Sequence, residues 1–313
     1  MSFLSVEIKE TNFENYGKCV KLSNGLIDVL VTIDFGPRII YFGFTGQKNI
    51  LYNDIERKYV TSNSSITERY GNNSAFFHYG GHRLCLSPKK MPDTFYPDNE
   101  PVTYSILPEG VSFTPPRQKK NDIQLSIEVI MSEGTEDIMV VHSAKNYSKE
   151  RQTLALSAIT MFNRGGLEVI PLNTQNDNPL IPNRTIALWP DTTVSDQKIF
   201  IGNKFVTINC NENLENNIKL GINNTCGWVS YSNEDYTLVK RYVHNAQAAY
   251  PDFGCSCETF VCNDYVELET LSPLYNLEPG DAIRHVENIF ISKSVPDANP
   301  NDEEKIDKFF NET

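Results

Sequence analysis

Residues 264–270 of the chain read Asp-Tyr-Val-Glu-Leu-Glu-Thr, a segment in which polar and apolar side chains alternate. Successive side chains of a β-strand point to opposite faces, so Glu267 and Glu269 share one face with the tyrosine. Val266 and Leu268 take the other face, where they can join a hydrophobic core. The segment therefore predicts a strand that buries one face and presents carboxylates on the other.

The same two-residue period recurs along most of the chain and predicts an all-β protein. Residues 27–33 alternate after a Ser-Asn-Gly turn, and residues 122–132 and 137–146 indicate a hairpin around residues 133–135. Further strands are expected at residues 152–162, 198–209, 226–232, 236–243, 264–270 and 282–292.

A helical pattern is expected only near the end of the chain. Asn301 or Asp302 can cap a short C-terminal helix that continues to Phe309-Phe310. Residues 59–73 are polar and lack periodicity, which predicts a long loop, either functional or simply a surface loop. Gly and Pro are spread evenly and no repeat or linker interrupts the sequence, so we expect one domain over residues 1–313.

Composition and charge exclude several classes of function. The 313 residues are 40% hydrophobic and 22% charged, which is ordinary for a globular protein. A formal net charge of −12 argues against nucleic acid as a partner. We expect no membrane association, because there is neither an apolar run of spanning length nor a signal-like N-terminus. Seven scattered cysteines favour reduced thiols and a cytoplasmic location.

A second informative segment, His-Tyr-Gly-Gly-His-Arg at residues 78–83, places two imidazoles around a glycine pair. An imidazole beside a carboxylate supplies the parts of an acid–base site. Two structural alternatives stay open: a half-buried hydrogen-bonding histidine, and a solvated strand face for the two glutamates. A metal enzyme using His78 and His82 is a third, minority interpretation, because no further ligand is evident nearby. We expect no metal and no organic cofactor.

Aromatic side chains next to polar ones indicate a carbohydrate ligand. Tyr96, Trp189 and Tyr250 each lie near an Asp or Asn, a combination that matches the apolar C–H faces and hydroxyls of a sugar. Each of them, taken alone, is more often a core residue. Arg38 is more often the anchor of an ion pair than a ligand contact. Motifs typical of phosphate-binding loops, dinucleotide-binding folds, serine hydrolases and zinc proteases are absent from the sequence.

Taken in order, these segments resemble the galactose mutarotase-like group, the aldose 1-epimerase superfamily, and most closely an uncharacterised branch of it. The matching segments cover almost the whole chain and are residues 21–25, 34–40, 80–84, 188–190, 250–252, 267–270 and 277–281. The resemblance implies a β-supersandwich, with a sugar lying across one concave face.

The resemblance also implies a chemistry. In mutarotases a glutamate takes the proton from the anomeric hydroxyl while a histidine protonates the ring oxygen, and the opened sugar recloses as the other anomer. Carried over, Glu269 matches the base, and either His82 or His78 matches the acid. The residues expected to contact the sugar are Arg38, Arg83, Tyr96, Trp189, Asp252 and Glu267.

One departure from the family pattern bears on catalysis. Aldose epimerases carry a further histidine on a mid-chain strand before Tyr-Phe-Asn, whereas residues 157–163 here keep Phe-Asn without a histidine. A positioned acid or base contributes about 10²–10⁴-fold to a rate. Two hypotheses therefore stand: an enzyme that interconverts anomers, and a non-catalytic carbohydrate-binding protein. Both predict a small-molecule carbohydrate as partner and leave the sugar and the oligomeric state open.

Overall fold

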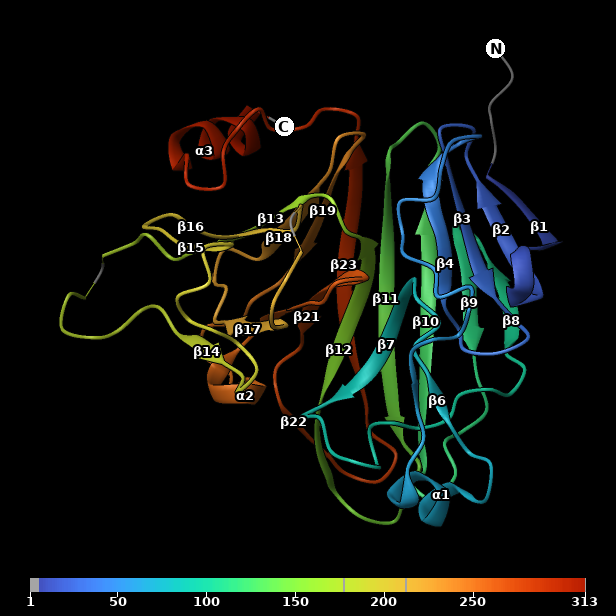
Figure 1. Cartoon of the computed structure of the whole chain (residues 1–313). Coiled ribbons are helices and arrows are strands. Elements are labelled where there is room, and N and C mark those ends of the chain that lie inside the picture. Colours follow the sequence, from blue (N-terminus) through green and yellow to red (C-terminus); the bar gives the residue numbers. More distant parts are fainter. Residues whose placement is uncertain (1–5, 177, 212, 313) are drawn as a thin grey trace.

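A computed structural model describes residues 6–176, 178–211 and 213–312. Two large antiparallel sheets make up most of the structure, and the long strands of both lie near its centre (Figure 1). In spatial order the first sheet contains β1 (Glu7–Asn12), β2 (Lys18–Ser23), β3 (Ile27–Thr32), β4 (Ile39–Phe44), β7 (His82–Ser87), β12 (Gln152–Asn163), β21 (Tyr265–Leu271), β20 (Cys257–Val261), β17 (Ile218–Ile222) and β14 (Ile186–Leu188), with β22 (Tyr275–Leu277) beside β12.

The second sheet contains the predicted hairpin. Its spatial order is β15 (Ile199–Ile201), β16 (Phe205–Asn209), β13 (Leu167–Pro171), β18 (Trp228–Ser232), β19 (Thr237–Tyr242), β23 (Ala282–Ser292), β11 (Asp137–Asn146), β10 (Ile123–Met131), β9 (Gly110–Thr114) and β8 (Thr103–Leu107). A third sheet pairs only β5 (Val60–Thr61) with β6 (Phe76–Phe77).

The sequence pattern predicts most of these strands correctly. The expected hairpin is confirmed, with Met131 opposite Ile138 at its closed end. The prediction of one continuous strand over residues 198–209 is wrong, because the chain turns in the middle of this segment. The Gly202 N–H donates to the Phe205 carbonyl at 2.9 Å, which divides the segment into β15 and β16.

The helices show one confirmed expectation and one error. The C-terminal helix α3 (Glu303–Glu312) is capped by Asp302, whose Oδ1 accepts from the Lys305 N–H at 3.2 Å. Residues 59–73 are not simply a loop, because they contain the short helix α1 (Ser64–Tyr70). Only Ile66 of α1 is buried, so the sequence carried no apolar periodicity to reveal it. Two further short elements are η1 (Glu14–Tyr16) and α2 (Pro251–Gly254).

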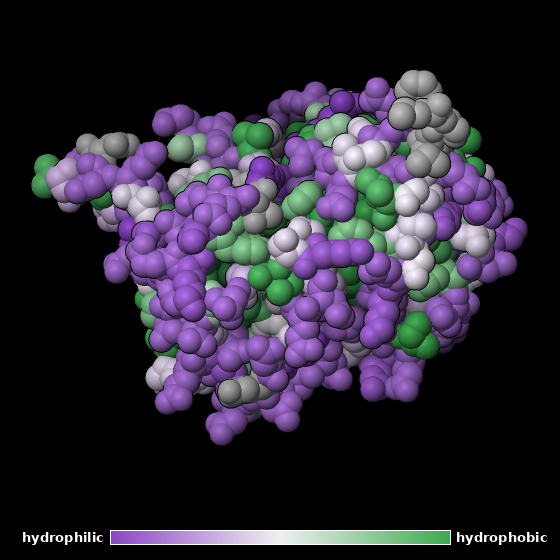
Figure 2. Space-filling model, turned by 90° about the horizontal axis from the view of Figure 1, so that it is seen from above, coloured by the Kyte–Doolittle hydropathy of each residue, from purple (hydrophilic) through white to green (hydrophobic). Residues whose placement is uncertain are grey.

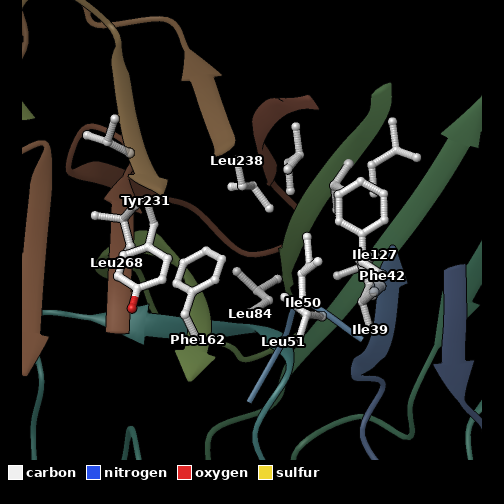
Figure 3. Packing of buried hydrophobic residues seen from close by; sticks show 14 of the residues in the cluster. Ile39, Phe42, Ile50, Leu51, Leu84, Ile127, Phe162, Tyr231, Leu238 and Leu268 are labelled. Atoms are coloured by element: carbon white, nitrogen blue, oxygen red, sulfur yellow. The ribbon is translucent and has the colours of Figure 1, made fainter. Parts of the chain in front are cut away.

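The hydrophobic core lies between the two large sheets and draws residues from both (Figure 3). Phe162 of β12 stacks on Tyr231 of β18 with ring centroids 4.8 Å apart, which joins the first sheet to the second. Leu84 of β7 and Leu268 of β21 point into the same core. Because side chains alternate along a strand, the residues beside these leucines must emerge on the outer face of the first sheet.

The surface is mainly polar, in line with the composition. Seen from above, hydrophilic residues cover most of the molecule and hydrophobic ones form smaller groups between them (Figure 2). None of the helices within the described ranges has both the length and the apolar character needed to cross a membrane.

We predict that Leu268→Ala lowers the free energy of unfolding by about 2–5 kcal/mol, because it leaves a cavity where the two sheets meet. Urea denaturation followed by circular dichroism measures the change. The control is Ile106→Ala on β8, where the side chain is 65% exposed, and its effect should stay within about 0.5 kcal/mol. Equal losses in the two variants would contradict the assignment of Leu268 to the core.

Candidate functional site

The outer face of the first sheet carries a row of charged side chains supplied by neighbouring strands. Antiparallel pairing puts Arg83 of β7 opposite Ile159 of β12, and Ile159 opposite Glu269 of β21. Glu269 in turn lies opposite Glu258 of β20. Residues that face each other across such a ladder lie on the same side of the sheet. Arg83, Glu269 and Glu258 therefore form one row across strands that are distant in sequence.

Glu269 is almost completely buried and is surrounded by groups that favour its charged form. The Ser157 hydroxyl donates to its Oε2 at 2.8 Å. The Lys219 Nζ lies 3.6 Å from its Oε1, and the Lys89 Nζ lies 3.9 Å from its Oε2. Burial on its own would raise the pKa of Glu269, but Lys219 and Lys89 outweigh burial and lower it. Glu269 is consequently a carboxylate at neutral pH and can accept a proton.

Glu258 has the opposite protonation state, although it lies directly beside Glu269. Burial, followed by the negative charge of Glu269, raises the pKa of Glu258 to about 8, while Lys219 at 3.2 Å works against this rise. Asp252 raises the pKa of Glu258 further. Glu258 therefore keeps its proton at neutral pH. Two carboxyl groups whose pKa values are driven apart form an acid and a base on one surface.

A second charged group, formed by Glu267, Arg83 and His78, lies next to Glu269 and Glu258. Glu267 and Glu269 share one face of β21. The Arg83 Nη2 lies 3.5 Å from the Glu267 Oε1, and the His78 Nδ1 lies 3.9 Å from the same oxygen. Burial opposes the charge of Glu267, but His78 and Arg83 hold its pKa well below the usual range. Burial lowers the pKa of His78, so its imidazole is neutral near pH 7.

Several buried polar atoms of this face have no hydrogen-bond partner among the described residues. They are Arg83 Nε and Nη1, His78 Nδ1, Glu267 Oε1 and Glu258 Oε1. Buried polar groups in folded proteins are nearly always paired, and each unpaired group costs about 1–3 kcal/mol. Donors and acceptors of this kind, gathered on one surface, fit a small ligand that offers several hydroxyl groups.

His82 does not belong to this site, so the expectation that it faces Glu269 is wrong. Its Nδ1 lies 2.8 Å from the Thr160 Oγ1 and its Nε2 lies 2.7 Å from the His142 Nε2, between the two sheets. The cause is the alternation along β7: Arg83 occupies the outer face, so His82 must point inward. His78 and His82 therefore cannot bind one metal ion together.

Two other expected contacts, Arg38 and Tyr96, line a small cavity that also includes Phe76, the ring over which the Arg83 guanidinium lies. Arg38 is buried, and its Nη1 lies 2.6 Å from the Asp98 Oδ2, which matches the ion-pair alternative. The cavity they share has a volume of about 40 Å³, which holds water but no sugar. The ion pair gives Arg38 a structural role, and a sugar contact by Arg38 or Tyr96 stays a prediction.

Trp189 and Asp252 lie close to the charged row. Both line a hollow of about 220 Å³, together with Leu188 and Phe253. The Lys219 Nζ lies 4.7 Å from the centre of the Trp189 ring, within range of a cation–π interaction. Lys219 thus connects the tryptophan to both carboxyl groups, and the structure brings Trp189, Asp252, Glu267, Glu269, Arg83 and His78 into one neighbourhood.

Sequence reasoning missed four residues of the site: Lys89, Ser157, Lys219 and Glu258. Lys219 comes from β17, whose sequence Ile-Lys-Leu-Gly-Ile does alternate and could have marked a short strand. Glu258 has a similar setting between Cys257 and Thr259 on β20. Neither strand identifies its neighbours in the sheet, so the sequence could not place these charges beside Glu269.

Comparison with known proteins identifies the fold. No protein-family model matches the sequence, and no curated protein does. A TPR-domain containing protein from Parabacteroides distasonis aligns with a TM-score of 0.61 and 15% identity, over 90% of this chain and 48% of that one, so the chain spans about half its length. A galactose mutarotase-like protein from Lactobacillus casei aligns with a TM-score of 0.56 and 10% identity, over 88% of this chain and 100% of that one.

A second galactose mutarotase-like protein, from Clostridium acetobutylicum, gives a TM-score of 0.51 and 12% identity, over 93% of this chain and 99% of that one. At such low identity the similarity establishes the fold alone. The chain has the fold of galactose mutarotase-like proteins, as its sequence resemblance implied.

We predict that Glu269→Gln lowers the pKa of Glu258, because it removes a negative charge that disfavours ionisation of the neighbouring carboxyl. Carbon-13 NMR of labelled glutamate side chains, followed over pH 4–10, measures the shift. Glu278→Gln, at an exposed position, is the control and should leave the titration unchanged. An identical Glu258 titration in the wild type and Glu269→Gln would show that the two carboxyl groups are not coupled.

Proposed function

We propose that this protein binds a small-molecule carbohydrate on the outer face of the first sheet and interconverts its anomers by acid–base catalysis. The observation that carries the proposal is the adjacency of Glu269 and Glu258 on one surface with Lys219 beside both, where burial and the neighbouring charges drive the two pKa values apart. The shared fold with galactose mutarotase-like proteins supports a carbohydrate as the ligand class.

The proposed reaction needs one base and one acid, and no net proton is gained or lost. Glu269 removes the proton from the anomeric hydroxyl while Glu258 protonates the ring oxygen, so that the bond between C1 and the ring oxygen breaks. Rotation about C1–C2 exposes the other face of the aldehyde, and the same two groups close the ring with their roles reversed. Lys219, which contacts both carboxyl groups, stabilises the negative charge as it moves between them.

The rest of the site is suited to holding a sugar in place. Arg83, His78 and Glu267 offer unpaired donors and acceptors to hydroxyl groups. Trp189 offers an aromatic surface to a C–H face. The side chains of Lys89 and Lys219 are 31% and 17% exposed, whereas Glu269 is 1% exposed. A ligand from solvent thus meets these two flexible ammonium groups first.

The second candidate function is non-catalytic carbohydrate binding. One specific observation favours it: Ser157, Ile159 and Met161 are the positions of β12 that pair with the outer-face residues of β7 and β21, and none of them is a histidine. His82 is turned into the core as well, and the carboxylate that His78 contacts is Glu267 rather than the proposed base Glu269.

Catalysis is tested by dissolving single anomers of several hexoses and pentoses and following their interconversion by polarimetry or proton NMR. We expect the wild type to relax at least one sugar faster than buffer, and Glu269→Gln to reduce that rate by about 10²–10⁴-fold. Glu278→Gln should keep the full rate.

The outcome of this experiment separates the two candidate functions. If the wild type is no faster than buffer with every sugar, the enzyme proposal fails. Saturable sugar binding that survives Glu269→Gln, without turnover, would then identify a binding protein.

The protonation states predict a characteristic pH dependence of kcat/KM. Glu258 must be protonated, and its pKa is raised to about 8, so the rate should fall as the pH rises through about 8. Glu269 must be ionised, and its pKa is lowered, so loss of rate on the acidic side begins only below the usual range of a glutamate. Initial rates from pH 4 to 10 measure the profile. Glu258→Gln should remove the alkaline decline, and a variant that keeps this decline would rule out Glu258 as the acid.

A further inference from the structure

Three side chains capable of binding a metal meet inside the sandwich, on the opposite side of β7 from the carbohydrate site. They are His82 of β7, His142 of β11 and Glu287 of β23, and all three are buried. The Nε2 atoms of the two histidines lie 2.7 Å apart. The Glu287 Oε2 lies 3.8 Å from the His82 Nε2 and 4.0 Å from the His142 Nε2. The ligands thus come from both large sheets.

The second nitrogen of each imidazole already has a partner that orients the ring. The His142 Nδ1 lies 3.0 Å from the His285 carbonyl oxygen, which can only accept, so Nδ1 carries the proton and the Nε2 lone pair is left to accept from His82 or to bind a metal. The His82 Nδ1 lies 2.8 Å from the Thr160 hydroxyl, which can either donate or accept. His82 can therefore place its proton on Nδ1 and free Nε2 for a metal. Outer partners of this type are typical of metal-binding histidines.

Glu287 contributes a carboxylate oxygen to which no described residue donates a hydrogen bond. Its Oε1 accepts from the Lys240 ammonium at 2.9 Å and from the Thr270 hydroxyl. Its Oε2 is buried and has no hydrogen-bond partner within the residues the structure describes. This free oxygen lies on the side of the two imidazoles. A fully buried and unpaired carboxylate oxygen is costly unless a cation or a water completes its surroundings.

We propose that His82, His142 and Glu287 form a buried binding site for a divalent metal ion of the zinc type, which joins the two sheets. Two imidazole nitrogens and one carboxylate oxygen are a donor set that zinc commonly uses. Tetrahedral bonds of 2.0–2.2 Å place ligand atoms about 3.4 Å apart, which lies within the 2.7–4.0 Å range observed here. Binding replaces the His82–His142 hydrogen bond and moves the His82 proton to Nδ1.

The ammonium of Lys240 sets the strength of this site. Lys240 is fully buried and already balances the charge of Glu287, so a bound divalent ion is close to a like charge. Replacing Lys240 with methionine removes that repulsion at similar side-chain volume. The variant also leaves Glu287 as an uncompensated buried charge, which is strongly destabilising until a metal neutralises it.

The test uses the full chain without a polyhistidine tag, incubated with zinc, dialysed against metal-free buffer and measured by elemental analysis. We expect about one zinc per wild-type chain and a thermal midpoint raised by a few degrees. His142→Asn and Glu287→Gln should lose the zinc. His244→Asn is the control, because His244 lies outside the cluster and pairs with Ser256, and it should retain one zinc.

Two further measurements keep the proposal testable if the core variants fail to fold. Cobalt(II) added to the wild type should give the intense visible absorption of a four-coordinate ion, which zinc then displaces. Lys240→Met should bind zinc at least about tenfold more tightly and recover thermal stability when zinc is added. A wild type without stoichiometric zinc, a cobalt spectrum of the aqueous ion, or unchanged zinc affinity in Lys240→Met would each overturn the metal site.

Discussion

The antiparallel register of β7, β12 and β21 is the constraint on which the proposed site depends. In these strands each residue that points into the core is followed by one that points to the outer face. Leu84 and Leu268 fill the space between the sheets, so Arg83 and Glu269 are held on the outside. A slip of one residue would exchange the two sets, burying charges in the core and exposing leucines. The core packing and the arrangement of the site are therefore specified by the same pairing.

Burial of the charged groups on the outer face costs solvation free energy, and it also shifts their pKa values. Low dielectric surroundings strengthen the effect of each neighbouring charge, and this moves the pKa values of Glu258 and Glu269 in opposite directions. Lys219 touches both groups and prevents their mutual repulsion from neutralising Glu269 as well. A site with unpaired buried atoms is less stable than a fully satisfied one, and the proposed polar ligand would supply the missing hydrogen-bond partners.

The sequence reveals features that depend on local periodicity and hides those that depend on pairing. Alternation alone places Glu267 and Glu269 on one face, and the structure agrees. It could not assign His82, because the glycine pair before it hides where β7 begins, and the facing direction depends on that start. Lys219 and Glu258 are close to Glu269 only through pairing between strands far apart in the chain. His142 and Glu287, which lie beside His82, are equally remote from it in sequence, so the motif could not reveal this cluster.

The two polar clusters, one in the core and one on the outer face, are connected by the strands that separate them. Lys240 of the second sheet donates to the carbonyl oxygens of Ala158 and Leu268, at 2.9 and 3.1 Å, while it pairs with Glu287. These two carbonyls belong to β12 and β21, next to Ile159 and Glu269. A shift of either strand would leave the buried Lys240 ammonium and the buried Glu287 carboxylate without their partners, at a cost of about 3–5 kcal/mol. The buried Lys240 ammonium therefore fixes the position of the β21 backbone from the core side of the sheet. Hydrophobic packing is non-directional and could not fix this position alone.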